Sequence, residues 1–195
     1  MTSSLRQRRR LETAREIQKA ALELATQKRL EDVTTEEIAI AAGVSTRTFF
    51  NYYPNKESAA IGHPPKFSEE AKDALRRGEG SLAEDLKQLL DKHIEMLSGD
   101  EDILRMVGNI LRTNEKARSI LDEFLTIERI ELTETLSGRV DSQQTSATLA
   151  KSATDTIGAA IYLWEHEEDM SLAEAMDAVW ASLLDASRLL LSSPS

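Results

Sequence analysis

Residues 34–56 read TTEEIAIAAGVSTRTFFNYYPNK, and this stretch decides the fold of the chain. Thr34 and Glu37 have the spacing of a capping box, which predicts the start of a helix. Gly43 follows the last apolar position of that helix, where a backbone often turns through the left-handed region that glycine adopts most easily. Ser45 can cap a second helix directly afterwards. The stretch therefore predicts two short helices joined by a tight turn, a helix-turn-helix.

The second of these helices has a polar outer face with one arginine, which suits the major groove of DNA. It ends in the aromatic run FFNYY at residues 49–53, followed by Pro-Asn-Lys at residues 54–56. With the Thr-Thr start and the Gly43 turn, this order and spacing resemble the DNA-binding head of the tetracycline-repressor (TetR) family over about residues 10 to 62. Arg29 stands where the family usually has glycine, so we expect the preceding helix to end differently here.

The resemblance implies an all-α fold of about nine helices, with an N-terminal three-helix DNA-binding head and a larger helical domain behind it. We place the head, with its basic N-terminal arm, at residues 1–62 and the effector-binding and dimerisation domain at residues 63–195. The boundary follows from Gly-His-Pro-Pro at residues 62–65, since adjacent prolines interrupt a helix. Beyond it, apolar residues recur at helical spacing, without the period-two runs typical of strands.

The formal net charge of -10 is unusual for a protein that binds DNA. Its distribution is uneven, because residues 1–62 carry a net charge of +2 and residues 63–195 carry -12. The first 19 residues contain six basic side chains and only two glutamates. Such an arm can bind phosphates, while an acidic body repels DNA and helps to hold the duplex at the head. The alternative is that the arginine run is only a solvated tail.

The resemblance, carried over position by position, implies nine DNA-contacting residues. Arg47 can donate to both major-groove acceptors of a guanine, so we expect it to read sequence. Thr46 and Asn51 could contact bases or phosphates, and Phe50 could touch a thymine methyl group or pack against the first helix. Phosphate contacts are expected from Thr35, Thr48, Tyr52 and Lys56. The full set is Thr35, Glu36, Thr46, Arg47, Thr48, Phe50, Asn51, Tyr52 and Lys56.

The resemblance also implies a small-molecule effector site in the second domain and a homodimer that binds a palindromic operator. The pocket candidates are adaptable or aromatic residues, each of which could instead be plain core. They are His93, Met96, Met106, Phe124, Ile127 and Tyr162. The last two helices carry apolar stripes that could form the dimer interface or face the chain's own core. The interface candidates are Ala153, Ile157, Ile161, Trp164, Met176, Val179, Trp180 and Leu183.

The chain lacks cysteine, and it shows no glycine-rich phosphate loop, nucleophile elbow or two-histidine metal helix. We therefore expect no enzyme, no metal and no cofactor. No run of eighteen apolar residues and no secretory segment is visible, which predicts a cytoplasmic protein without a membrane partner. The leading hypothesis is a bacterial repressor released from its operator by a small molecule. The alternatives are an activator of the same family, or a helical small-molecule-binding or adaptor protein without a DNA function.

Overall fold

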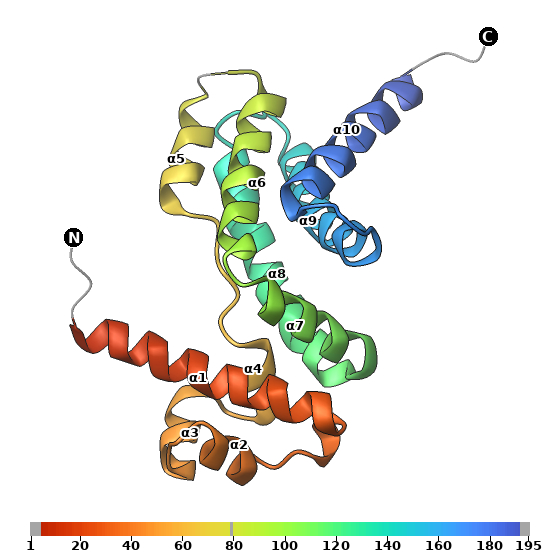
Figure 1. Ribbon diagram of the computed structural model, residues 1–195. Helices are drawn as coiled ribbons and strands as arrows, with labels where there is room; N and C mark the ends of the chain where they lie inside the picture. Colours follow the sequence, from red (N-terminus) through yellow and green to blue (C-terminus); the bar gives the residue numbers. More distant parts are fainter. Residues whose placement is uncertain (1–4, 79, 192–195) are drawn as a thin grey trace. The chain divides into compact units, whose positions relative to one another are not determined.

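The protein is described by a computed structural model over residues 5–78 and 80–191, and all its regular secondary structure in that part is helical (Figure 1). The all-α prediction is confirmed, with ten α-helices and one short 3-10 helix in the described residues. The elements are α1 (Leu5–Gln27), η1 (Leu30–Asp32), α2 (Thr35–Ala41), α3 (Thr46–Tyr52), α4 (Lys56–Ile61), α5 (Glu69–Arg77), α6 (Leu82–Ser98), α7 (Glu101–Thr113), α8 (Glu115–Leu136), α9 (Gln143–His166) and α10 (Leu172–Leu191). None of these described helices is both long and apolar enough to cross a membrane.

Packing divides the chain into two units. Unit 1 consists of Met1–Pro64 and Glu101–Phe124, and unit 2 of Pro65–Asp100 and Leu125–Ser195. The sequence-based division at residues 62 and 63 placed residues 101–124 with the second domain, whereas packing places them with the first. The reason is that α7 and the first part of α8 contribute apolar side chains to the core of the head.

The core of unit 1 forms where α1 packs against α2, α4 and α7. Ile17 of α1, Ile38 of α2 and Phe49 of α3 are fully buried in it. The hairpin of α7 and α8 adds Ile110 and Ala117 to the same cluster. These contacts make α1 the common support of the two short helices, since α2 and α3 have only seven residues each and depend on tertiary packing for stability.

Local signals in the sequence explain how α2 begins and ends. The Thr34 hydroxyl accepts a hydrogen bond from the Glu37 amide at 3.2 Å, and the Glu37 carboxylate accepts one from the Thr34 amide at 2.8 Å. The capping box is therefore confirmed. Gly43 has a φ of 67°, as the turn requires. Arg29 is extended, with a φ of -62°, so α1 ends without the left-handed residue that a glycine would supply.

Unit 2 contains α5, α6, the second part of α8, α9 and α10. In it α5 packs against α6, while α6 also packs against α9 and α10, which lie side by side. Buried apolar side chains of α6 and α8, such as Leu90 and Leu132, form its core. Arg139 joins the segment after α8 to α5 and α6. Its guanidinium donates to the buried Asp85 carboxylate of α6 and to the carbonyl of Leu75 in α5.

Candidate nucleic-acid interface

The helix-turn-helix presents one face of α3 to solvent. Phe49 and Tyr53 are buried, and Arg47 and Asn51, four positions apart, are exposed on the opposite side of the helix. Phe50 is 53% exposed although its ring lies edge-on to that of Phe49, with centroids 5.3 Å apart. An arginine, an amide and an aromatic edge can each contact a base edge in the major groove.

Tyr53, which directly follows the last residue of α3, anchors that helix. Tyr53 donates a hydrogen bond from its hydroxyl to the carbonyl of Ala14 on α1, at 3.1 Å. Burial raises the pKa of Tyr53 to about 12, so the hydroxyl keeps its proton and this bond at neutral pH. The orientation of α3 is therefore tied to α1 at its C-terminal end.

The hydroxyl groups expected to contact phosphates have partners within the protein. Thr48 lies 2.8 Å from the Ser45 hydroxyl, and Thr35 donates to the Glu36 carboxylate at 3.3 Å. Both threonines are half-buried, as is Thr46, while Glu36 is exposed. A hydroxyl can donate and accept at the same time, so these local bonds leave room for a phosphate contact.

Lys56 has an intramolecular role that sequence reasoning did not foresee. Its ammonium group donates to the carbonyl of Glu31 at 2.5 Å and to that of Val33 at 2.8 Å. These bonds join the start of α4 to the segment that leads into α2. Lys56 therefore holds α2 in place, whether or not it also contacts DNA.

A second ionic contact supports the start of α2. The Lys28 ammonium donates to the Glu37 carboxylate at 2.7 Å. This bond, together with the bonds from Thr34, lowers the pKa of Glu37 to about 2. The carboxylate therefore stays charged and keeps capping α2 throughout the physiological pH range.

The α7–α8 hairpin is fastened to the same region by two polar contacts. The Asn114 amide donates to the Glu31 carboxylate at 2.8 Å, and its oxygen accepts from the Ala117 amide at the start of α8. Lys116 forms an ion pair at 3.0 Å with Glu57, whose side chain is only 9% exposed. Neither the Asn114–Glu31 contact nor the Lys116–Glu57 contact has a local signal in the sequence, because each joins residues at least 59 positions apart.

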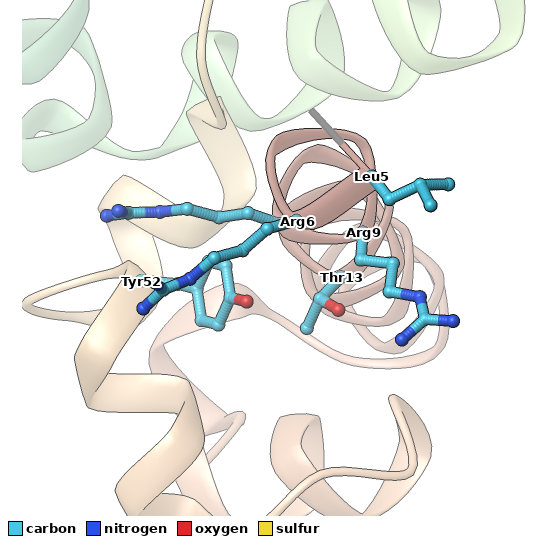
Figure 2. A pocket seen from close by; sticks show the side chains of 6 residues that line it. Leu5, Arg6, Arg9, Thr13 and Tyr52 are labelled. Atoms are coloured by element: carbon cyan, nitrogen blue, oxygen red, sulfur yellow. The ribbon is translucent and has the colours of Figure 1, made fainter. Parts of the chain in front are cut away.

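A basic groove lies beside the end of α3. It is a shallow surface depression of about 400 Å³ lined by Leu5, Arg6, Arg9, Arg10, Thr13 and Tyr52. Figure 2 shows the side chains of Arg6, Arg9 and Thr13, all from α1, around the opening that Tyr52 faces from α3. The arginine run is therefore helical from Leu5 onward. In the sequence, the spacing of three and four residues between Arg6, Arg9, Arg10 and Thr13 was the signal that these side chains share one side of a helix.

The six pocket candidates are divided between the two units. Met106 packs against the core of unit 1, whereas His93 and Met96 belong to α6 in unit 2. Met96, Ile127 and Tyr162 are exposed, with Tyr162 stacked on His166. Phe124 is the last residue of unit 1.

His93 is the one pocket candidate that is buried and incompletely bonded. Its ring lies 4.8 Å from that of Phe67, and its Nδ1 atom has no hydrogen-bond partner in the described part of the chain. Burial lowers the pKa of His93 to about 4, so the imidazole is neutral at physiological pH.

The candidate interface residues divide into two groups. Ala153, Trp164, Met176 and Trp180 are buried in the core of unit 2. The other four, which are half-buried, are Ile157, Ile161, Val179 and Leu183. These four form the part of the two apolar stripes that remains accessible for association.

Residues 17–58 match the family model of the bacterial regulatory proteins of the tetR family. Among solved structures, FadR of Thermus thermophilus, a TetR-family transcriptional repressor in complex with lauroyl-CoA, is 23% identical, with a TM-score of 0.55 and coverage of 93% of this chain and 97% of that one. The fatty acid degradation regulator FadR of Bacillus halodurans is 22% identical, with a TM-score of 0.54 and coverage of 88% and 94%. At these identities the likeness establishes the fold. No curated protein matches the chain by sequence.

Proposed function

Since residues 17–58 form a DNA-binding domain of the TetR family in a chain with the fold of TetR-family regulators, we propose that this protein is a sequence-specific transcriptional repressor. The observation that carries the proposal is the helix-turn-helix itself. It presents Arg47 and Asn51 on the free face of α3, while Tyr53 ties α3 to α1 and Lys56 ties the start of α4 to the segment before α2. The protein acts by binding rather than by catalysis.

Recognition of a palindromic operator requires two copies of α3. One seven-residue helix reads too few base pairs for useful specificity, so a homodimer with two heads is the functional form. Ile157, Ile161, Val179 and Leu183 supply apolar surface for that association on the adjacent helices α9 and α10. The remaining four interface candidates support these helices from inside unit 2.

Release from the operator is brought about by a small molecule that binds the helical body. The effector shifts the population from the conformation that fits the operator to one that does not. The size of this shift is set by the difference in the effector's affinity for the two conformations. His93 is the first candidate contact, because its buried Nδ1 atom is free to bond to a ligand. Long-chain acyl-CoA thioesters are the first effectors to test, since the FadR structure of T. thermophilus holds lauroyl-CoA.

Selection of duplexes from a random DNA pool by the full-length protein tests the proposal. We expect enrichment of a palindromic site, and no enrichment would contradict DNA recognition. On the selected site, Arg47→Ala should remove about 1 to 3 kcal/mol of preference at one base pair of each half-site. Arg188→Ala, which removes the same charge from α10, is the control. An equal loss for every sequence would refute base reading by Arg47.

Addition of lauroyl-CoA to the protein–operator complex tests the effector class. We expect release of the DNA, with coenzyme A and laurate alone as controls. Release that is absent, or equal with the controls, would reject acyl-CoA as the effector while leaving the DNA-binding function intact.

A further inference from the structure

One helix, α8, belongs to both units. It runs without a break from Glu115 to Leu136, and the boundary between the units falls inside it, after Phe124. Backbone hydrogen bonds between successive turns make an α-helix stiff along its axis. A displacement of the part of α8 in unit 2 therefore also moves the part in unit 1.

The start of α8 is bonded to the segments on both sides of the helix-turn-helix. The buried Asn114, which caps α8, donates from its amide group to the Glu31 carboxylate at 2.8 Å, in η1 just before α2. Lys116, in the first turn of α8, pairs at 3.0 Å with the Glu57 carboxylate in the first turn of α4, after α3. A movement of α8 therefore acts on the segment that leads into α2 and on the segment that follows α3.

Further along α8, two glutamates one turn apart hold the first residues of unit 2. The buried Glu128 carboxylate accepts a hydrogen bond from the Phe67 amide at 3.1 Å. The Glu131 carboxylate pairs with Lys66 at 3.1 Å and with the buried Lys72 at 3.0 Å. This part of α8 therefore moves together with α5 and the segment before it, unless these bonds break.

The Phe67 ring connects these bonds to the buried histidine that is the first candidate for effector contact. The ring is itself buried and lies 4.8 Å from that of His93 on α6. A ligand bonded to the His93 Nδ1 atom, which has no partner among the described residues, changes the packing of the Phe67 ring. Because the Phe67 amide is bonded to Glu128, this change also acts on α8.

We propose that α8 transmits changes in unit 2 to the helix-turn-helix, with Glu128 as the contact in unit 2 and with Asn114 and Lys116 as the contacts in unit 1. The inference rests on the proposed repressor function and names the route by which an effector acts on the head. The competing route is the chain itself, through residues 62–65 between α4 and unit 2. Coupling along a route is demonstrated when one substitution alters the effect of another, distant one.

A double-mutant cycle separates the two routes, with amide hydrogen exchange of α2 in the DNA-free, full-length protein as the readout. Glu128→Ala breaks the bond in unit 2, and we expect it to lower the protection of the α2 amides about tenfold. Glu134→Ala removes an exposed carboxylate from the same part of α8 and is the control. It should change that protection by less than about twofold.

The double variant Glu31→Ala/Lys116→Met removes both contacts in unit 1. In this background Glu128→Ala should change the protection of α2 by less than about twofold, because the link to the helix-turn-helix is already broken. The same loss in both backgrounds would mean that the change arrives along the chain or through general destabilisation, and would overturn the α8 route. Unaltered protection of α2 in Glu128→Ala alone would also overturn it. Glu128→Gln, which weakens the bond without leaving a cavity, replaces the alanine variant if that one does not fold.

Operator binding tests the same route in the repressor. Glu128→Ala should weaken binding of the selected operator about fivefold in the otherwise wild-type protein, and by no more than about twofold in Glu31→Ala/Lys116→Met. Equal weakening in both backgrounds, with the operator still bound, overturns the α8 route alone. Failure of the wild-type protein to bind any DNA overturns the proposed function, whereas the hydrogen-exchange cycle, which uses no DNA, still decides whether α8 couples the two units.

Discussion

Replacement of Gly62 by alanine should destabilise the head far more than the same replacement at Gly43. Gly62 ends α4 with a φ of 70° and a ψ of -141°, a conformation that costs a residue with a Cβ atom about 1 to 3 kcal/mol. The new Cβ would also lie 2.3 Å from the amide group of Gln18. That amide donates to the carbonyls of Ala60 at 3.3 Å and Ile61 at 3.0 Å, and it has to move away from them.

The expected cost of Gly62→Ala is therefore the backbone strain plus two hydrogen bonds of about 1 kcal/mol each, or about 3 to 5 kcal/mol in total. A Cβ atom at Gly43 meets nothing within 4 Å, so Gly43→Ala should cost only about 1 to 2 kcal/mol of strain. In a Gln18→Ala background the clash disappears, and Gly62→Ala should then cost no more than the strain. The two substitutions at Gln18 and Gly62 are thus expected to be non-additive by about 2 kcal/mol, the worth of the two hydrogen bonds.

Amide hydrogen exchange of α1 and α4 measures the stability of the head in each variant. Tryptophan fluorescence during urea unfolding serves as the internal control, because Trp164 and Trp180 both lie in unit 2. Equal costs at Gly62 and Gly43, or additivity with Gln18→Ala, would refute the assignment of the Gln18 amide as the second source of destabilisation.

Three further substitutions test single contacts. Lys56→Met keeps the side-chain length but removes the bonds to the two carbonyls before α2, so the free energy of unfolding should fall by about 1 to 3 kcal/mol in urea titrations; an unchanged stability would contradict this role. Arg139→Met leaves the buried Asp85 carboxylate unpaired and should cost about 3 to 5 kcal/mol, with partial recovery in combination with Asp85→Asn, measured in the same way. His93 has a folded-state pKa of about 4 and an ordinary value of 6.5, so the unfolded chain binds its proton first as the pH falls. Wild-type stability should therefore drop by about 3 kcal/mol between pH 6.5 and pH 4, and His93→Leu should remove most of that slope in tryptophan-detected unfolding.

Short-range signals were sufficient to predict the helix-turn-helix. The capping box at Thr34, the glycine at position 43 and the cap at Ser45 each involve residues within three positions of one another, and all three have the expected geometry. Asn55 likewise caps α4, accepting from the Ser58 amide at 2.8 Å. Such features depend on local backbone chemistry, which a sequence states directly.

Contacts between distant segments were not predictable in the same way. The chemistry of Lys56 suits a phosphate and a carbonyl equally, and only the fold places two carbonyls within its reach. The apolar stripes of α9 and α10 likewise do not indicate whether they pack within the chain or against another subunit. Trp164 and Met176 pack inside unit 2, although their spacing is equally compatible with an interface between subunits.

The incorporation of the α7–α8 hairpin into unit 1 has a consequence for protein engineering. A chimeric regulator made by joining residues 1–64 to a foreign sensor would lose Ile110 and Ala117 from the core of the head. The buried carboxylate of Glu57 would lose its cation, and Glu31 would lose its amide partner. A chimera that keeps the head intact therefore needs two separate stretches of sequence, 1–64 and 101–124. A chimera that carries only the first stretch would have α3 but would lack part of the core that supports it.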